Sequence, residues 1–206
     1  MSDLYPTKIE TERLRFVPVH TQHVLDAYEI CSRPEMEDVT RFMPWGRHET
    51  PKVTFDFLSM QEENWNEHKG VDYALSLREG ENGAGEIAGF GGLSTEWDRR
   101  VGGLGLWLRP RFWGRGYSGE RAEALAALAF DVLDLEVVTV SHVVENEKSQ
   151  RAIEKYVDKL GGRRDGTKPN NIIIDGEPRD EYFYSISRGE WLESTGGKYD
   201  AEFYWD

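Results

Sequence analysis

The sequence predicts a mixed α/β (α+β) fold, in which a mostly antiparallel central sheet contains one parallel strand pair and is flanked by about four helices. Two patterns predict it. Residues 73–77 and 87–93 are strand-like segments on either side of a turn, which is typical of an antiparallel hairpin. Residues 102–108 and 137–143 are strand-like and enclose the alanine- and leucine-rich segment 117–133. Because a strand–helix–strand crossover joins parallel strands, the second pattern predicts the parallel pair.

The N-terminal part of the chain supplies one strand and two helices. Residues 12–18 alternate between apolar and polar side chains, which predicts a first strand. Thr21 is a suitable cap for a helix over 22–32. Residues 33–50 contain prolines, a glycine and scattered aromatic side chains, so we expect an irregular connection there. A second helix is expected over 51–65, because threonine precedes it and proline occupies its first position.

The strand over 102–108 leads through a basic turn directly into the central helix. Gly114 and Gly116 lie two residues apart in this turn, and Arg109, Arg111 and Arg115 surround them. Glycine lets the backbone approach a ligand closely, and the N–H groups that begin a helix attract negative charge. The turn therefore predicts an anion site, most simply for a phosphate, and the arginines strengthen this interpretation. A glycine turn without a ligand is the alternative, whereas the dinucleotide and Walker patterns do not fit.

After the parallel pair, the sequence predicts a further helix and the remaining strands. Asn146 can cap a helix. Short strand pieces are expected at 163–165 and 172–174, on either side of a turn with the sequence GTKPNN. Residues 180–186 then predict a final strand.

The length and composition indicate one domain. The chain has 206 residues, of which 38% are hydrophobic and 12% aromatic, so it can bury a full core. We expect residues 1–188 to form that domain and 189–206 to form an aromatic and acidic C-terminal tail. The tail is too aromatic for a disordered linker, so we expect it to pack on its own domain or on a second subunit. Both a monomer and a homodimer fit this pattern.

The formal charge of −13 argues against binding to nucleic acid or to an anionic membrane. The negative charge suits a cationic binding partner such as a polyamine or a basic peptide, although a generally acidic, solvated surface adapted to high salt is the simpler explanation. No apolar stretch is long enough to cross a bilayer, so we expect a cytoplasmic protein. Cys31 is the single cysteine and is expected to be a buried thiol. The histidines are not spaced as metal ligands, so no metal is expected.

Two segments carry a resemblance to a known family. Arg111-Phe112-Trp113-Gly114-Arg115-Gly116 matches the (Gln/Arg)-x-x-Gly-x-(Gly/Ala) motif of the GCN5-related N-acetyltransferases (GNAT family). Together with the downstream Asn146-x-x-Ser149, it resembles the RimJ/RimL-like branch, which acetylates ribosomal-protein N-termini. The resemblance implies the GNAT fold, in which the two parallel strands splay apart at their ends.

The resemblance also implies acetyl-coenzyme A as the acyl donor. In the family, N–H groups of the glycine turn hold its pyrophosphate, the pantetheine follows the preceding strand, and the second motif lies beside the pantetheine and the thioester. The residues implied in cofactor binding are Leu106, Trp107, Leu108, Arg111, Phe112, Trp113, Gly114, Arg115, Gly116, Tyr117, Ser118, Asn146 and Ser149.

The implied catalytic residues are Ser149 and Asn146. The Ser149 hydroxyl either protonates the leaving thiolate or bonds a backbone carbonyl one turn back. Asn146 can serve both the cofactor and the helix cap. Glu120, a position where the family usually has glutamate, is expected to stabilise the helix start rather than to catalyse. The general base that accepts the amine proton is undetermined, and the candidates are Glu96, His142, Asp180 and Glu181.

The acceptor side is less defined. In related enzymes the region over 33–50 covers the acceptor pocket, so Phe42, Met43 and Trp45 are candidates for substrate binding. A loop that packs its own aromatic side chains onto the core explains them equally well. The helix after Asn146 also departs from the family pattern, because Gly161-Gly162 come late and predict one extra turn.

The expected function is direct transfer of an acetyl group from acetyl-coenzyme A to a primary amine, either a protein N-terminus or a small molecule. A catalytically silent acetyl-coenzyme A sensor with the same fold is the alternative. A different nucleotide-binding protein that uses the same turn is the third hypothesis.

Overall fold

The computed structural model describes residues 3–205 and contains a nine-stranded sheet. The strands follow the order β7-β8-β6-β5-β4-β3-β2-β1-β9 across the sheet, and β5 and β6 form its parallel pair while the other neighbours are antiparallel. The strands are β1 (Lys8–Glu10), β2 (Leu14–Pro18), β3 (Gly70–Leu77), β4 (Ile87–Glu96), β5 (Val101–Leu108), β6 (Val137–Val143), β7 (Arg163–Ile174), β8 (Glu177–Ser187) and β9 (Glu202–Tyr204). The predicted fold class is confirmed.

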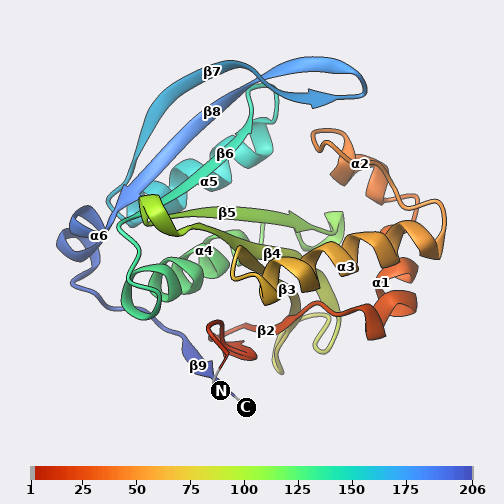
Figure 1. The fold of residues 1–206 in the computed structure, drawn as a ribbon, viewed down its shortest axis with the longest axis horizontal. Helices are drawn as coiled ribbons and strands as arrows, with labels where there is room; N and C mark the ends of the chain where they lie inside the picture. The colour runs from red at the N-terminus through yellow and green to blue at the C-terminus, as the bar shows by residue number, and fades with distance from the viewer. Residues whose placement is uncertain (1–2, 206) are drawn as a thin grey trace.

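Helices cover both faces of this sheet (Figure 1). The helices are α1 (Val24–Cys31), α2 (Met36–Thr40), α3 (Pro51–Asn66), α4 (Tyr117–Ala127), α5 (Glu147–Lys159) and α6 (Arg188–Thr195), and a π-helical turn over Leu128–Val132 extends α4. Buried side chains of α4 and α5 pack in one cluster, and those of α1 to α3 pack in another. Because Leu75 of β3 belongs to the first cluster and Ala74 contacts the second, the two clusters lie on opposite faces.

The parallel strands β5 and β6 pair only at their beginnings. Their register joins Val101 to Val137, Gly102 to Val138 and Gly103 to Thr139. Both strands continue beyond these pairs, and Figure 1 shows that they diverge. The splay that the family resemblance implied is therefore present, and the backbone edges that face it are free of strand partners.

Several local predictions were wrong in detail. Thr21 does not cap α1; it begins a 3-10 turn, and its hydroxyl donates to Glu62 at 3.0 Å. The segment 33–50 contains the short helix α2, whose Met36 is fully buried. The GTKPNN segment is not a turn, because β7 continues through it with two shifts in register against β8. The helix α5 does continue to Lys159, as predicted from the late glycine pair.

The C-terminal segment contacts the rest of the chain. Trp191 of α6 is 1% exposed, and β9 pairs with β1, so β8 is not the last strand. No helix in residues 3–205 is long and apolar enough to cross a membrane.

Candidate active site

The glycine turn presents a row of unpaired peptide N–H groups. Gly114 and Gly116 adopt left-handed backbone conformations with φ of 75° and 86°. Within residues 3–205, the N–H groups of 114–118 donate no hydrogen bond. A Cβ added at Gly114 would meet nothing within 4 Å, so the space in front of the turn is open. Unpaired N–H groups at the start of α4 and an open approach fit a phosphate or pyrophosphate group.

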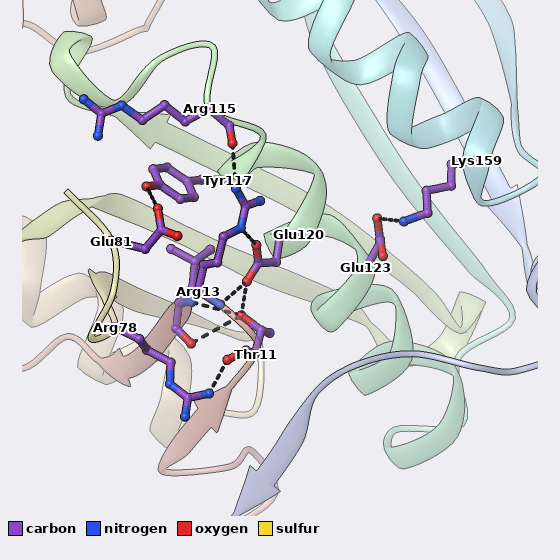
Figure 2. Close-up of polar contacts among 10 residues, drawn as sticks. Thr11, Arg13, Arg78, Glu81, Arg115, Tyr117, Glu120, Glu123 and Lys159 are labelled. Carbon is purple, nitrogen blue, oxygen red and sulfur yellow. Dashed lines mark hydrogen bonds and ion pairs between the residues drawn. The ribbon is translucent and has the colours of Figure 1, made fainter. Parts of the chain in front are cut away.

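A polar cluster behind the turn fixes its shape (Figure 2). The Glu120 carboxylate in the first turn of α4 accepts hydrogen bonds from Arg13 Nε at 2.6 Å, from the Arg13 peptide N–H at 2.7 Å and from the Thr11 hydroxyl at 2.5 Å. Arg13 in turn donates to the Arg115 carbonyl at 2.9 Å. The Glu120 carboxylate therefore joins the segment before β2 to the start of α4, which fits the predicted structural role.

The arginines near the turn have protein partners. Arg109 is 4% exposed and pairs with Glu35 at 3.1 Å and with Glu86 at 3.5 Å. Arg111 pairs with the same Glu86 at 2.8 Å, and Arg115 donates to the Asn82 carbonyl at 3.0 Å. The expectation that all three strengthen the anion site is wrong for Arg109, because its buried guanidinium pairs with two carboxylates instead.

The large side chains named for cofactor binding point mostly into the protein. Phe112 is fully buried and Trp107 is 8% exposed, so only their backbone atoms are available to a ligand. Tyr117 is also buried, and its hydroxyl donates to Glu81 at 2.5 Å. Trp113 is partly exposed; its indole N–H donates to the Leu108 carbonyl at 2.7 Å.

The free edge of β5 offers a further N–H group at the splay. The Arg109 N–H donates to the Ala88 carbonyl of β4 at 2.8 Å. Since successive N–H groups of a strand point to opposite edges, the N–H of Leu106 faces β6. The two strands do not pair beyond Gly103, so this N–H is available to a carbonyl oxygen in the gap.

Helix α5 begins beside this gap. The Asn146 side chain caps it by accepting the Ser149 N–H at 3.1 Å. The Ser149 side chain is partly exposed, and within residues 3–205 its hydroxyl makes no hydrogen bond. The local bond to a backbone carbonyl is therefore not formed, and this hydroxyl is available for a ligand.

A cavity of about 380 Å³ lies on the α3 face, where β5 and β6 separate. Its lining combines polar side chains of α3 and the sheet with backbone of glycine-rich strands. The lining residues are Gln61, Asn64, Lys69, Gly70, Val71, Asp72, Gly92, Leu93, Ser94, Gly103, Leu104, Gly105, Thr139, Val140, Ser141 and Phe183. It lies on the face opposite α4 and α5, so it offers an acceptor a route to the splay from the other side.

Asp72 is the carboxylate in the lining of this cavity, and sequence reasoning missed it. Burial raises the pKa of Asp72 to about 6, partly offset by the positive charge of Arg121. Asp72 lies one position before the predicted strand 73–77. An acidic residue in an apolar strand, with glycines in the following strand, was the signal that could have identified it.

The candidate bases occupy different places. Glu181 is 7% exposed and accepts a hydrogen bond from the Ser141 hydroxyl at 3.0 Å, so it lies next to the cavity. His142 is buried; its Nδ1 bonds the Val143 carbonyl at 2.8 Å, and burial lowers its pKa. Asp180 accepts the Asn170 N–H at 2.8 Å, a contact that joins β8 to β7. Glu96 is exposed and pairs with an arginine on the same short segment.

The candidate substrate residues lie beside the second core cluster. Met43 and Trp45 pack against it, and the Trp45 ring is 6.1 Å from that of Trp107. Phe42 is partly exposed beneath the Arg41 guanidinium. The 380 Å³ cavity is lined by other residues.

Known proteins share this architecture. Residues 13–156 match the family model described as an acetyltransferase (GNAT) domain. The chain is 28% identical over 88 residues to YdaF of Bacillus subtilis (strain 168), provisionally named a ribosomal N-acetyltransferase. That alignment covers 43% of this chain and 46% of the relative, so the chain matches less than half of the relative's length.

Two solved structures resemble most of the chain. A crystal structure of a provisionally assigned acetyltransferase from T. thermophilus is 27% identical, with a TM-score of 0.74 over 93% of this chain and 95% of that chain. The Microcin C7 self immunity acetyltransferase MccE, solved with acetyl-CoA and AMP, has a TM-score of 0.74 over 85% of this chain and 93% of that chain. At 15% identity, the second likeness shows a shared fold.

Proposed function

The chain belongs to the acetyltransferase (GNAT) domain family, and we propose that it transfers the acetyl group of acetyl-coenzyme A directly to the nitrogen of a primary amine. The observation that carries this proposal is the row of unpaired N–H groups over 114–118, which lies at the start of α4. A pyrophosphate bound there would be held by several charge-assisted hydrogen bonds.

The chain's own residues have distinct roles in this proposal. The N–H of Leu106 stabilises the oxygen of the thioester carbonyl as negative charge develops on it. The free hydroxyl of Ser149 donates a proton to the leaving thiolate. Asn146 keeps the start of α5, and thus Ser149, in place through its cap. The acceptor is a protein N-terminus or a small amine, and the name of the B. subtilis relative, a ribosomal N-acetyltransferase, favours a protein acceptor.

We expect the domain over 1–188 to carry this chemistry, with 189–206 as a C-terminal tail that packs on it. A titration calorimeter would measure acetyl-coenzyme A binding, and a thiol reagent would follow coenzyme A release in the presence of peptides and polyamines. Amine-dependent release supports the transferase. Binding without release across a broad amine panel would favour the silent sensor, and no binding would contradict both.

A further inference from the structure

The Asp72 carboxylate leans across the sheet toward the splay. A Cβ built on Gly92, its cross-strand neighbour on β4, would lie 2.1 Å from Asp72 Oδ1. The carboxylate oxygen therefore occupies nearly the position of a residue-92 side chain, above β4 and one strand spacing of about 4.8 Å from β5. This placement is available because residue 92 has no side chain.

The space between this carboxylate and the edge of β5 is open. Gly92 pairs with Gly105 of β5, and a Cβ added at Gly105 would meet nothing within 4 Å. Within residues 3–205, the Asp72 carboxylate forms no hydrogen bond or ion pair. The open space beside the carboxylate, which is bordered by Gly92 and Gly105, has room for one small cationic group.

A buried cation lies behind the same part of the sheet. Arg121 of α4 is 1% exposed, and its Nε and Nη1 have no hydrogen-bond partner in the described chain. Its Cδ would lie 3.4 Å from a Cβ on Gly91. Because Gly91 and Gly92 face opposite sides, Arg121 lies on the opposite face of the sheet from the Asp72 carboxylate, and the two charges interact through the sheet. The positive charge favours the ionised form of the carboxylate, which is the form that binds an ammonium group.

We propose that Asp72 binds the ammonium group of the acceptor in the space above Gly105 and removes its proton. This inference rests on the proposed function and identifies its acceptor site and base. The proton passes from nitrogen to the Asp72 carboxylate, and the neutral amine then forms the carbon–nitrogen bond with the thioester carbonyl. As the carbon–sulfur bond breaks, the nitrogen loses its second proton and the leaving thiolate gains one, so it departs as a thiol. Asp72 then passes its own proton to water.

The surroundings of Asp72 contain few competing charges. From α3 it faces Gln61 and Asn64, which are uncharged. Lys69 at the cavity edge pairs with Glu67. Across the cavity, Glu181 is engaged by Ser141 and by Asn171, and Arg121 lies behind the sheet. An arriving ammonium group therefore meets Asp72 as the carboxylate without a partner.

The test compares Asp72→Asn with wild type and with Asp98→Asn, an exposed carboxylate outside the cavity. The probes are a peptide with a free N-terminus, the same peptide N-acetylated, and spermidine. Because a general base contributes roughly 100-fold or more, kcat/KM for the reactive amine is expected to fall about 100-fold in Asp72→Asn and to stay unchanged in Asp98→Asn. Acetyl-coenzyme A affinity is expected to stay within about twofold in both variants.

The pH profile separates a base from a structural residue. The reacting pair is a carboxylate and an ammonium ion, so wild-type kcat/KM for the peptide should peak near pH 7, fall below about pH 6 as Asp72 is protonated, and fall above about pH 8 as the amine loses its proton. In Asp72→Asn, kcat/KM should rise steadily through this range with the neutral fraction of the amine. A wild-type profile that also rises steadily, or an unchanged kcat/KM in Asp72→Asn, overturns the proposal.

Two further measurements cover the remaining outcomes. Gly105→Ala adds a methyl group to the open space without a clash, so it should raise KM for the amine about tenfold or more while coenzyme A affinity is kept. If wild type binds acetyl-coenzyme A but acetylates no amine, the proposed function fails. Peptide binding to the coenzyme A complex then still decides the site, because loss in Asp72→Asn supports it and equal affinity overturns it.

Discussion

Replacing Gly114 by alanine tests the anion site at its most sensitive point. The residue has a left-handed φ of 75°, which costs an alanine about 1–2 kcal/mol of folding free energy. The added methyl group meets no protein atom within 4 Å, so the substitution causes no clash. It does project into the space in front of the unpaired N–H groups, where the pyrophosphate is proposed to lie.

The expected loss of affinity follows from those N–H groups. A hydrogen bond to a charged group contributes about 1.5–3 kcal/mol, and a displaced pyrophosphate would lose about two of them. The resulting loss of about 3–6 kcal/mol raises the Kd for acetyl-coenzyme A by roughly 100-fold or more. Gly114→Trp fills the same space completely and should abolish measurable binding.

Gly176→Ala is a matched control for the backbone effect. Gly176 has a φ of 79°, and a Cβ there also meets nothing within 4 Å. It lies in the turn between β7 and β8, away from the proposed site. Chemical denaturation should show the same loss of about 1–2 kcal/mol in both variants. Calorimetry should show weaker acetyl-coenzyme A binding only in Gly114→Ala, and equal affinity in the two variants would refute the assignment.

Other substitutions test single elements of the structure. Ser149→Ala should lower kcat by roughly 100-fold and leave acetyl-coenzyme A affinity within about twofold; an unchanged single-turnover rate would remove Ser149 from the chemistry. Glu120→Ala breaks the contacts that join α4 to the segment before β2 and should lower the free energy of unfolding by about 2–4 kcal/mol, as urea titration would show. Trp191→Ala should lower it by about 3–5 kcal/mol, and a smaller loss would mean that the C-terminal segment packs loosely. Burial raises the pKa of Cys31 to about 12, so at pH 8 a thiol reagent should label it slowly in the folded protein and rapidly in urea; equal rates would contradict its burial. The same shift predicts that stability is lost above about pH 9, where the unfolded thiol ionises and the folded one does not.

The local features of the site were predictable because they depend on neighbouring residues. The left-handed turn at Gly114 and Gly116, the helix that follows it and the Asn146 cap are each set within a few positions of the chain. The parallel pair followed from the handedness of the crossover between β5 and β6. The sequence by itself thus determined the fold class, the family and the place of the glycine turn.

Tertiary structure decided which distant residues meet. Arg109 lies next to the glycine turn in sequence, yet it is buried against Glu35, which lies 74 positions away. β9 pairs with β1 at the other end of the chain, so the segment predicted as a tail contributes a strand to the same sheet. These contacts depend on strand order and burial, which no local pattern encodes.

The proposed acceptor site also depends on contacts between residues that are distant in the sequence. Asp72 and Gly92 are neighbours only because β3 and β4 pair in one particular register, and Gly105 joins them through the pairing of β4 with β5. A shift of one residue in either register would turn the carboxylate or the open space to the other face of the sheet. The sequence therefore determined the glycine turn that we propose for a cofactor phosphate, whereas the pairing of the strands decided where the proposed amine site lies.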